Sequence, residues 1–523
     1  MPTPAPLTVE SPYRKFTRKP ERVPHPYGYR TEHLTITDRD GSTLYETEDR
    51  ALYEEIFLQD DVETLERYFA VEPLAIPKLY SLPDDDEGFF DVSLIYLNAL
   101  NYGSLGIIQL LVSYELEYLD SKEKIRFDRV GFQLLTEAAR WGHFEMVQFF
   151  LDNQPFYADI HDRDWVGNTA LLAVADLHQH KYVRCHTYSG VRLETTEGMM
   201  NFLLDRGACA ADVVLPPVDP HETPRMPETV LTLAAKWSSP EMIKRLIDCG
   251  ANVHAKFTYF AWDLGFYAGD EDFHHATALF VGCLFDNSKA IKILIDFRGD
   301  NVEISDMLRP RDTRGLFPIH WASQNHMVTE CRDVPESGFQ ERAEDTISTI
   351  GVLLEYDPTL VNIQDDNRNT PLHHAVYTLW LNELFYTSIL KFLCDKGADA
   401  SICNEKGQTP LHILFCSTHT SLPINVAAVS ILLTYGASPI AADVDGNTPV
   451  HLAALRLESV DAMSFLLQKG GDAFQRNLKQ ETALDRVTIG TLSLGAVKSG
   501  EKDLTKARED MVSILTKAGE GSH

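Results

Sequence analysis

The sequence predicts an all-α fold in which pairs of helices repeat along the chain and stack into a solenoid. One observation is a short phrase, Thr-Pro-apolar-His, that returns with its histidines at His320, His373, His412 and His451; the first copy has Phe317 in place of threonine. The other is an apolar run with helical spacing that follows the phrase and closes on a glycine, at Gly397, Gly436 and Gly470. Because self-similar units bury their apolar faces only against their neighbours, we expect one elongated domain rather than several globules.

The Thr-Pro pair that opens each complete copy predicts the start of a helix. A threonine hydroxyl accepts a hydrogen bond from an unpaired amide of the first turn. Proline in the next position loses no hydrogen bond and has a backbone angle that suits the helix. The complete copies are Thr370 with Pro371, Thr409 with Pro410, and Thr448 with Pro449.

The glycine that closes each apolar run predicts the end of the second helix. Glycine enters the left-handed backbone region at little cost, and a residue in this region commonly follows the last helical residue. A unit therefore consists of two antiparallel helices followed by a turn.

The phrase and the glycine-closed helix together resemble the ankyrin repeat. The resemblance implies short β-turn fingers between units. It also implies that His373, His412 and His451 hydrogen-bond around the Thr-Pro turn and toward the neighbouring repeat, which is a structural role. Ankyrin repeats have a period of about 33 residues. The histidines here are farther apart, so we expect insertions.

Weaker copies of the template extend toward the N-terminus, for about eleven units in all. Their histidine position holds another residue, and we expect the polar bridge to be lost there; the residues are Thr136, Leu172, Thr232 and Phe280. The predicted parts of the chain are a flexible arm at 1–46, divergent helical repeats at 47–130, degenerate repeats with insertions at 131–309, well-matched repeats at 310–485 and a degenerate C-terminal capping repeat at 486–523.

Residues 1–46 resemble a repeat least. They are rich in proline and weakly basic, which is typical of a flexible arm. A nuclear-import signal or an anion-binding tail is one interpretation of the basic residues, and a solvated linker is another.

The balance of charge bears on the choice of partner. The chain has 47 lysine and arginine residues against 77 aspartate and glutamate residues, for a formal net charge of −30. Such a field repels phosphate backbones, so we expect no direct binding of nucleic acid. It attracts basic surfaces, which favours a protein partner with a basic surface; simple solubility of an extended protein explains the acidity equally well. Composition does not determine the oligomeric state.

The expected location rests on cysteine usage and on the absence of long apolar runs. The 8 cysteines form no Cys-x-x-Cys pair, and several occupy apolar repeat positions, as expected for reduced thiols. No apolar run approaches the roughly 18 residues of a membrane span, and the N-terminal residues are polar. We therefore expect no membrane association and a location in the cytoplasm, the nucleus or both.

The insertions fall on two different edges of the expected solenoid. Most lie between the first and second helices of a repeat, at 177–196, 325–346, 378–387, 416–425 and 487–505. Two lie between successive repeats, where the fingers are expected, at 211–227 and 257–275. In ankyrin proteins the fingers and first helices form the concave surface that most often binds partners.

The finger insertion at 257–275 is the candidate for partner binding. Rigid aromatic rings supply contact area at a low entropy cost, and the interleaved acids would orient a basic, partly apolar peptide. The candidate residues are Tyr259, Phe260, Trp262, Phe266, Tyr267, Asp270 and Asp272. Packing of these rings on the neighbouring fingers is the alternative.

Patterns for catalysis and metal binding are weak. His178, His180, Cys185 and His186 in the 177–196 insertion are ligand types suited to zinc, but their spacing matches no standard zinc finger. No phosphate-binding loop or nucleophile elbow occurs where its strand or helix would be required. We therefore assign no catalytic residue, no cofactor and no metal, and we expect that the protein is not an enzyme.

Three hypotheses of function result. The first is a non-catalytic interaction scaffold or adaptor that binds a protein partner through the concave finger surface. The second is an ankyrin-type transcriptional co-regulator that acts through a DNA-binding partner. The third, from another class, is a metal-dependent enzyme that uses the 177–196 insertion.

Overall fold

The structure is a computed structural model of the chain. It describes residues 15–24, 30–37, 43–48, 56–71, 96, 99–118, 134–154, 158–164, 166–176, 190–215, 226–259, 273–324, 336–377, 383–416, 424–457, 459–489 and 501–520. Contacts divide the chain into two compact units, the first comprising residues 1–177 and 188–222 and the second residues 178–187 and 223–523. The sequence predicted one continuous domain. The boundaries fall within the insertions at 177–196 and 211–227, which interrupt the regular spacing of the repeats.

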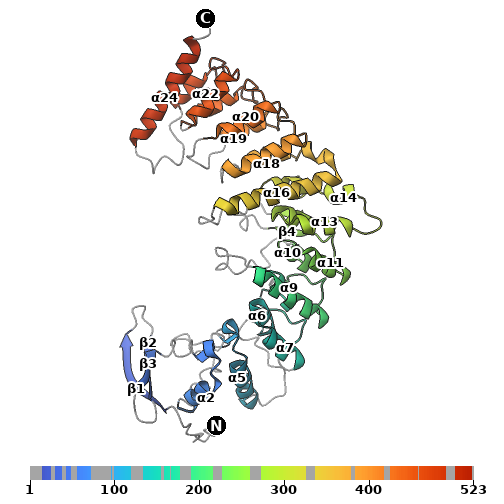
Figure 1. The fold of residues 1–523 in the computed structure, drawn as a ribbon, viewed down its shortest axis with the longest axis vertical. Helices are drawn as coiled ribbons and strands as arrows, with labels where there is room; N and C mark the ends of the chain where they lie inside the picture. The colour runs from blue at the N-terminus through green and yellow to red at the C-terminus, as the bar shows by residue number, and fades with distance from the viewer. Residues whose placement is uncertain are drawn as a thin grey trace. The chain divides into compact units, whose positions relative to one another are not determined.

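The first unit contains both strands and helices. Its helices include α2 (Val62–Val71), α5 (Leu105–Tyr118), α6 (Leu134–Trp141), α7 (Phe144–Asp152), α8 (Ala170–Ala175) and α9 (Gly190–Asp205) (Figure 1). Helix α6 packs against α7 and α8, and α8 packs against α9, so the contacts run from each pair to the next.

The N-terminal part of the first unit differs from the flexible arm that the sequence predicted. Strands β1 (Lys15–Pro24), β2 (Arg30–Thr37) and β3 (Thr43–Glu48) form an antiparallel sheet in the order β1-β2-β3. Strand β2 contains three threonines and one isoleucine, and both residue types favour extended structure. The prolines of β1 lie in an edge strand, where a missing amide is tolerated, and the pairing of β1 with β2 is irregular between Arg18 and Arg22.

The second unit is a row of helix pairs. The pairs are α10 (Val230–Ala234) with α11 (Pro240–Asp248), α12 (Ala278–Leu284) with α13 (Ser288–Asp296), α15 (Pro318–Ser323) with α16 (Glu336–Tyr356), α17 (Pro371–Tyr377) with α18 (Glu383–Asp395), α19 (Pro410–Cys416) with α20 (Val426–Thr434), α21 (Pro449–Ala453) with α22 (Val460–Gln468) and α23 (Ala483–Ile489) with α24 (Glu501–Glu520). Two short helices, α14 (Ile304–Leu308) and the 3-10 helix η5 (Pro358–Asn362), lie between pairs.

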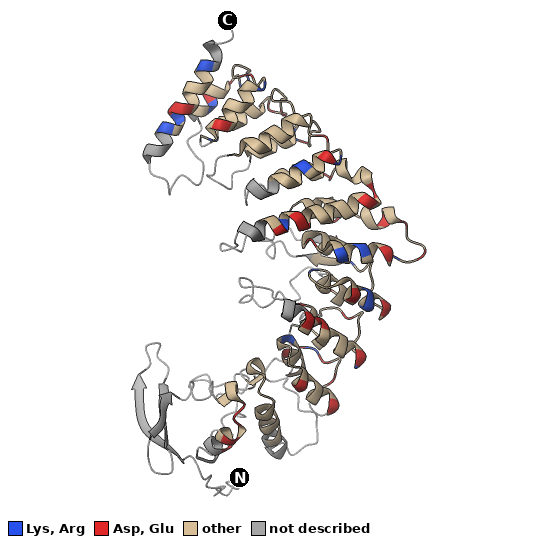
Figure 2. Cartoon of the chain, in the orientation of Figure 1, with Lys and Arg blue, Asp and Glu red and all other residues tan. Residues whose placement is uncertain are grey.

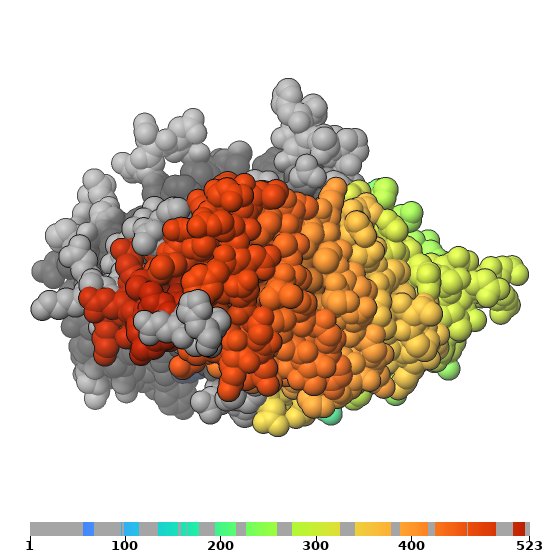
Figure 3. Space-filling model, turned by 90° about the horizontal axis from the view of Figure 1, so that it is seen from above, coloured from blue at the N-terminus to red at the C-terminus, as the bar shows by residue number. Residues whose placement is uncertain are grey.

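Each pair of the second unit contacts the pair before and the pair after it. First helices pack on first helices, as α15 on α17 and α17 on α19, and second helices pack on second helices. Figure 3 shows the resulting layers in succession from red to green. This arrangement confirms the predicted fold of stacked helix pairs, whereas the number of repeats, about eleven, stays a prediction.

The core of the second unit is a double row of apolar residues, one row from each set of helices. The apolar position of the phrase is completely buried in successive first helices, at Leu279, Ile319, Leu372, Leu411 and Val450. The second helices contribute Leu294, Leu353, Leu393, Leu432 and Leu466, which are equally buried. Each helix pair therefore buries its apolar residues against the neighbouring pairs and not in a separate core of its own.

The ends of the second helices are as the sequence predicted, but some of their starts are not. After α18 and α20 the chain turns at Gly397 and Gly436, whose φ angles are 97° and 104°. Helix α16, however, begins at Glu336, so part of the 325–346 insertion extends this helix. Helix α9 likewise begins inside the 177–196 insertion.

Among the residues that the structure describes, no helix combines the length and the apolar character that crossing a bilayer requires.

Candidate functional site

From α12 and α13 onward, successive helix pairs of the second unit are joined by β-turn fingers that begin at an aspartate or asparagine. In one finger, a carboxylate oxygen of Asp443 accepts hydrogen bonds from the backbone amides of Asp445 (3.0 Å) and Asn447 (2.8 Å). The equivalent bond to the amide four residues on is made by Asp312, Asp365, Asn404 and Asn477. A short acceptor side chain at this place supports a tight turn.

One position of each finger lies in the left-handed backbone region. In three fingers the residue is glycine, at Gly315, Gly407 and Gly446, and in two it is Arg368 or Gln480. This position explains why glycine stands upstream of the recurring phrase, since other residues pay a steric cost there.

Backbone hydrogen bonds join neighbouring fingers into a ladder. The amide of Glu405 donates to the carbonyl of Asn367 (2.9 Å), that of Val444 to Lys406 (3.0 Å) and that of Leu478 to Asp445 (3.0 Å). Asparagine side chains add cross-links, such as the amide of Asn404 to the side-chain oxygen of Asn369 (3.0 Å). The β-turns of the fingers from 365 to 481 are therefore joined into one continuous edge.

The histidines of the phrase link each Thr-Pro turn to the next finger. In His373, Nδ1 accepts a hydrogen bond from the backbone amide of Thr370 (3.1 Å), and Nε2 lies 3.0 Å from the carbonyl oxygen of Gln408. His412 bonds in the same way to Thr409 and to the carbonyls of Ala441 and Asn447. His451 bonds to Thr448 and to the carbonyl of Glu481. The prolines Pro371, Pro410 and Pro449 are the first helical residues of α17, α19 and α21.

These histidines are neutral, because burial lowers their pKa. Burial lowers the pKa of His373 to about 4 and that of His320 to about 3, and it lowers the pKa of His412 and His451 as well. With Nδ1 accepting from an amide, a neutral ring has its proton on Nε2 and donates it to the carbonyl of the next finger. Both nitrogens are thus engaged in structural bonds.

The expectation that repeats without histidine lose the polar bridge is wrong at Thr232. The hydroxyl of Thr232 accepts from the backbone amide of Thr229 (2.7 Å), and the hydroxyl of Thr229 accepts from the amide of Thr232 (3.1 Å). Threonine is long enough to close the turn within its own repeat. It is too short to make the second bond that histidine makes to the next finger.

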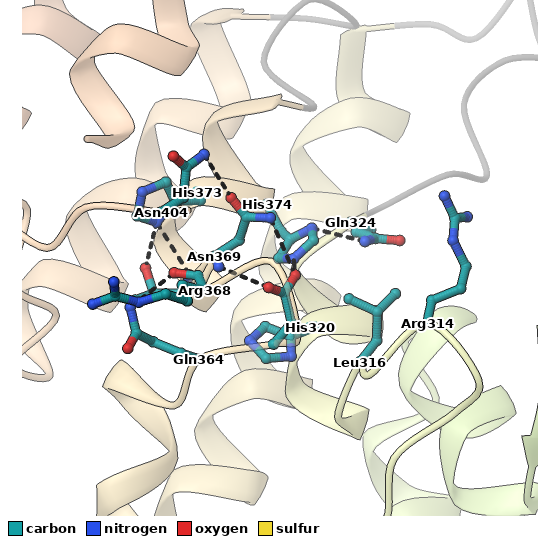
Figure 4. A network of polar contacts seen from close by, with 12 residues as sticks. Arg314, Leu316, His320, Gln324, Gln364, Arg368, Asn369, His373, His374 and Asn404 are labelled. Carbon is teal, nitrogen blue, oxygen red and sulfur yellow. Dashed lines mark hydrogen bonds and ion pairs between the residues drawn. The ribbon is translucent and has the colours of Figure 1, made fainter. Parts of the chain in front are cut away.

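A polar network connects α15 to the finger at Asp365 (Figure 4). Nε2 of His374 donates to the carboxylate of Asp365 (2.9 Å), and the side-chain amide of Gln324 lies 2.7 Å from Nδ1 of His374. Burial raises the pKa of the Asp365 carboxyl, but the hydrogen bond from His374 outweighs burial and holds this pKa below its usual value. The ring of His320 lies 5.0 Å from that of His374. Sequence reasoning could not connect Gln324 and His320 with His374 and Asp365, because they come from different repeats.

The finger insertion predicted to bind a partner is a β-hairpin at its base. Strands β4 (Phe257–Tyr259) and β5 (Phe273–Ala276) pair antiparallel, and the amide of Thr258 donates to the carbonyl of Met226 (3.0 Å). The side chain of Phe257 is completely buried, so this ring packs inward. Tyr259 is placed by its backbone at the end of β4. The other candidate residues, Phe260, Trp262, Phe266, Tyr267, Asp270 and Asp272, lie outside the described residues.

Four apolar side chains that the sequence analysis did not single out are exposed on the last two fingers. They are Ile440 (52% exposed), Val444 (60%), Phe474 (55%) and Leu478 (74%), and we call them the terminal-finger patch. A signal for them exists in the sequence, since the equivalent positions of earlier fingers hold polar residues. It is visible only once the fingers are aligned by their turns.

The described residues form no cluster suited to a metal ion. Within the described ranges, His, Cys, Asp and Glu form no group of three or more arranged to hold a metal ion. His178, His180, Cys185 and His186 lie outside these ranges. Among the described cysteines, Cys283 and Cys394 are buried free thiols, and burial raises the pKa of Cys394 to about 12.

Comparison with known proteins identifies two parts of the second unit. Residues 381–477 match the family model described as ankyrin repeats in three copies, and residues 228–256 match the model of a single ankyrin repeat. The first segment contains two of the complete Thr-Pro-apolar-His copies, those of His412 and His451.

Individual relatives match over limited segments. An intracellular phospholipase A2 of Caenorhabditis elegans is 30% identical over 141 residues, 26% of this chain and 12% of that protein. A putative ankyrin repeat protein of Rickettsia felis is 36% identical over 94 residues, 17% of this chain and 40% of that protein. The human B-cell lymphoma 3 protein is 35% identical over 100 residues, 19% of this chain and 20% of that protein. The matches thus span less than half of the length of each relative.

Proposed function

Since this chain is an ankyrin-repeat protein, we propose that it is a non-catalytic adaptor that binds a protein partner through its fingers and first helices. Ankyrin repeats are an interaction fold, and the stacked pairs here present many similar positions along one edge. The observation that carries the proposal is the hydrogen-bonded ladder of fingers from 365 to 481. A ladder of this kind holds surface side chains in fixed positions, which reduces the entropy that a partner loses on binding.

The engagement of the polar motif supports binding rather than catalysis. Each motif histidine is neutral and uses both ring nitrogens on backbone groups, so none is free to transfer a proton. His374 also uses both nitrogens, on Asp365 and Gln324. These residues stabilise the stack and leave recognition to the exposed residues of the fingers.

The charge of the chain bears on the chemistry of the partner. Acidic residues are spread along the ribbon of the second unit rather than gathered at one end (Figure 2). With a net charge of −30, the chain attracts a partner with a basic surface from solution, and raising the salt concentration slows the association.

Affinity capture from native cells tests the proposal. The full chain is compared with a variant that lacks residues 258–272, the finger insertion, and with a matched variant that lacks residues 417–423, between α19 and α20. We expect a specific protein to be captured by the wild type and by the 417–423 deletion, and to be lost with the 258–272 deletion. Failure of the full chain to capture any specific protein contradicts the adaptor function itself.

A transcriptional co-regulator that acts through a DNA-binding partner is the second candidate. The net negative charge disfavours direct contact with DNA, and the basic residues near the N-terminus favour nuclear import. We place the protein in the cytoplasm, the nucleus or both on this basis. Localisation of a fluorescent fusion with and without residues 1–30 separates this candidate from a purely cytoplasmic adaptor, since only an import signal makes nuclear accumulation depend on that segment.

Enzymatic function is the least supported hypothesis. The similarity to a phospholipase A2 covers 12% of that protein, so it does not carry the activity over to this chain. Incubation of the purified chain with phosphatidylcholine vesicles tests it directly, and we expect no release of fatty acid. Release above that of a heat-denatured control contradicts the non-catalytic function.

A further inference from the structure

We propose that the terminal-finger patch binds an extended segment of the partner protein that alternates apolar residues and carries basic residues beside them. This inference rests on the adaptor function and names the place and the chemistry of one contact. It is independent of the finger insertion at 257–275, which belongs to a different repeat.

The residues of the patch differ from those at the equivalent positions of the other fingers of this chain. In the finger of Asp443 the exposed residues alternate, with Ile440, Ala442 and Val444 more exposed than Ala441 and Asp443 between them. In the three preceding fingers these positions hold Arg309, Arg311 and Thr313 in the first, Asn362, Gln364 and Asp366 in the second, and Ser401, Cys403 and Glu405 in the third. In the following finger they hold Phe474, Arg476 and Leu478. Apolar residues occupy both outer positions only in the last two of these five fingers.

The turn itself does not require these apolar residues. All five fingers make the same hydrogen bond from their first aspartate or asparagine, whether polar or apolar residues surround it. In the earlier fingers, residues at the outer positions make polar contacts, such as Arg309 with Asp357 (2.7 Å) and Asp366 with Arg311. Exposed apolar side chains without a local structural task indicate a surface that another molecule covers.

The members of the patch lie on neighbouring segments of the ladder. The amide of Leu478 donates to the carbonyl of Asp445, directly after Val444. The side chain of Leu478 extends over Gly446, since a Cβ placed on that glycine would come within 3.2 Å of the leucine Cγ. Ile440 and Phe474 occupy matching positions of the same two fingers.

The ladder offers a place for one more backbone hydrogen bond. The carbonyls of Asn367, Lys406 and Asp445 each accept from the following finger, and the matching carbonyl is that of Lys479. Among the described residues no further finger follows 477–481. An extended segment can therefore donate one of its own amides to this carbonyl, as the following finger does at each earlier junction of the ladder.

The area of the patch argues against a second copy of this chain as the occupant. The four side chains offer on the order of 400 Å² of exposed apolar surface, which is the size of a functional patch on a monomer. A stable complex of two globular proteins buries about 800 Å² per partner, roughly twice as much. An extended segment that uses backbone hydrogen bonds needs less apolar contact.

Charge around the patch favours basic residues in that segment. Exposed carboxylates stand beside its members at Asp445, next to Val444, and at Asp472, two residues before Phe474. Of the nearby cations, Arg476 donates to the carbonyl of Gln480 within its own finger, and the exposed Lys479 lies next to Leu478. Basic residues of the segment are therefore expected beside Val444 and Phe474 rather than beside Leu478. The net charge of −30 acts in the same direction over longer distances.

Selection from a library of random twelve-residue peptides displayed on phage tests the proposal with the full-length chain. The affinity of the enriched peptides is then measured for the double variant Val444→Ser with Leu478→Ser. The matched control is the double variant Asp366→Ser with Glu405→Ser, which changes the equivalent positions of the two preceding fingers. All four side chains are exposed, so the variants should fold, and circular dichroism checks that they do.

We expect enriched peptides to alternate apolar residues and to contain lysine or arginine, and we expect the patch variant to bind them at least about tenfold more weakly than the control variant. Peptides that bind both variants alike overturn the proposal, and so does a library that yields no selective peptide. Self-association of the full chain that the patch substitutions abolish also overturns it, because the patch would then join two copies.

Capture from native cells distinguishes failure of this inference from failure of the adaptor function. If the patch variant still captures the partner of the wild type at full strength, the inference is wrong and the adaptor function stands. If neither chain captures a specific protein, the adaptor function is wrong.

Discussion

Replacement of His412 by alanine should be among the more damaging substitutions in the described part of the second unit. The imidazole is completely buried, its Nδ1 accepts from the amide of Thr409 (3.1 Å), and its Nε2 lies 3.0 Å from the carbonyl of Ala441 and 3.2 Å from that of Asn447. Alanine keeps the helix but removes every one of these bonds.

The expected loss is about 3 kcal/mol of the free energy of unfolding. Leaving the buried amide of Thr409 without its acceptor costs roughly 1–3 kcal/mol, and the volume that the ring vacates adds a comparable cavity cost. The carbonyl of Asn447 loses less, because it also accepts from the amide of Asp443 (2.9 Å). Thr232→Ala should cost about 1–2 kcal/mol, since Thr232 closes only its own turn.

Urea unfolding followed by far-ultraviolet circular dichroism measures both losses, and hydrogen exchange over residues 404–416 shows whether the damage is local. A useful control is His254→Ala. Nε2 of His254 also lies 2.8 Å from a carbonyl, that of Arg298, but the residue is exposed, so its loss should cost less than about 0.5 kcal/mol. A loss at His412 no larger than that at Thr232 or His254 would refute the reasoning that the buried bridge between repeats stabilises the stack.

Three further predictions concern pH, the finger insertion and metal. Because the folded pKa of His373, about 4, lies below the unfolded value near 6.5, the unfolded state gains a proton first as pH falls; stability should drop by about 1.4 kcal/mol per pH unit per such histidine between these values. Urea titrations of the wild type and of His373→Asn test this, and equal slopes would contradict it. Trp262→Ala should leave the melting temperature nearly unchanged while weakening partner capture, whereas a large drop would assign this ring to the core. Elemental analysis of the purified protein should find no stoichiometric zinc, and the double variant His178→Ala with His180→Ala should give the same result. Zinc that is present in the wild type and absent from this variant would support the metal hypothesis.

The terminal-finger patch shows why exposure could not be inferred from residue type. Val444 and Leu478 look in the sequence like ordinary members of an apolar pattern, as Val450 does a few residues on. The structure buries Val450 completely and leaves Leu478 74% exposed. Which apolar residue faces water depends on the position of the neighbouring repeat, and that position is a property of the stack.

The sequence by itself determined where the first helices of the well-matched repeats begin and where their second helices end. Thr409 with Pro410 opens a helix and Gly436 ends one through interactions with the adjacent backbone, so such signals act wherever the chain carries them. The tertiary structure alone decided the pairing of β1 with β2, the turn bridge at Thr232, the network of Asp365 with His374 and the exposure of the terminal-finger patch. Each of these depends on groups brought together by folding or on the space that a neighbour leaves, and a linear pattern of residues contains neither.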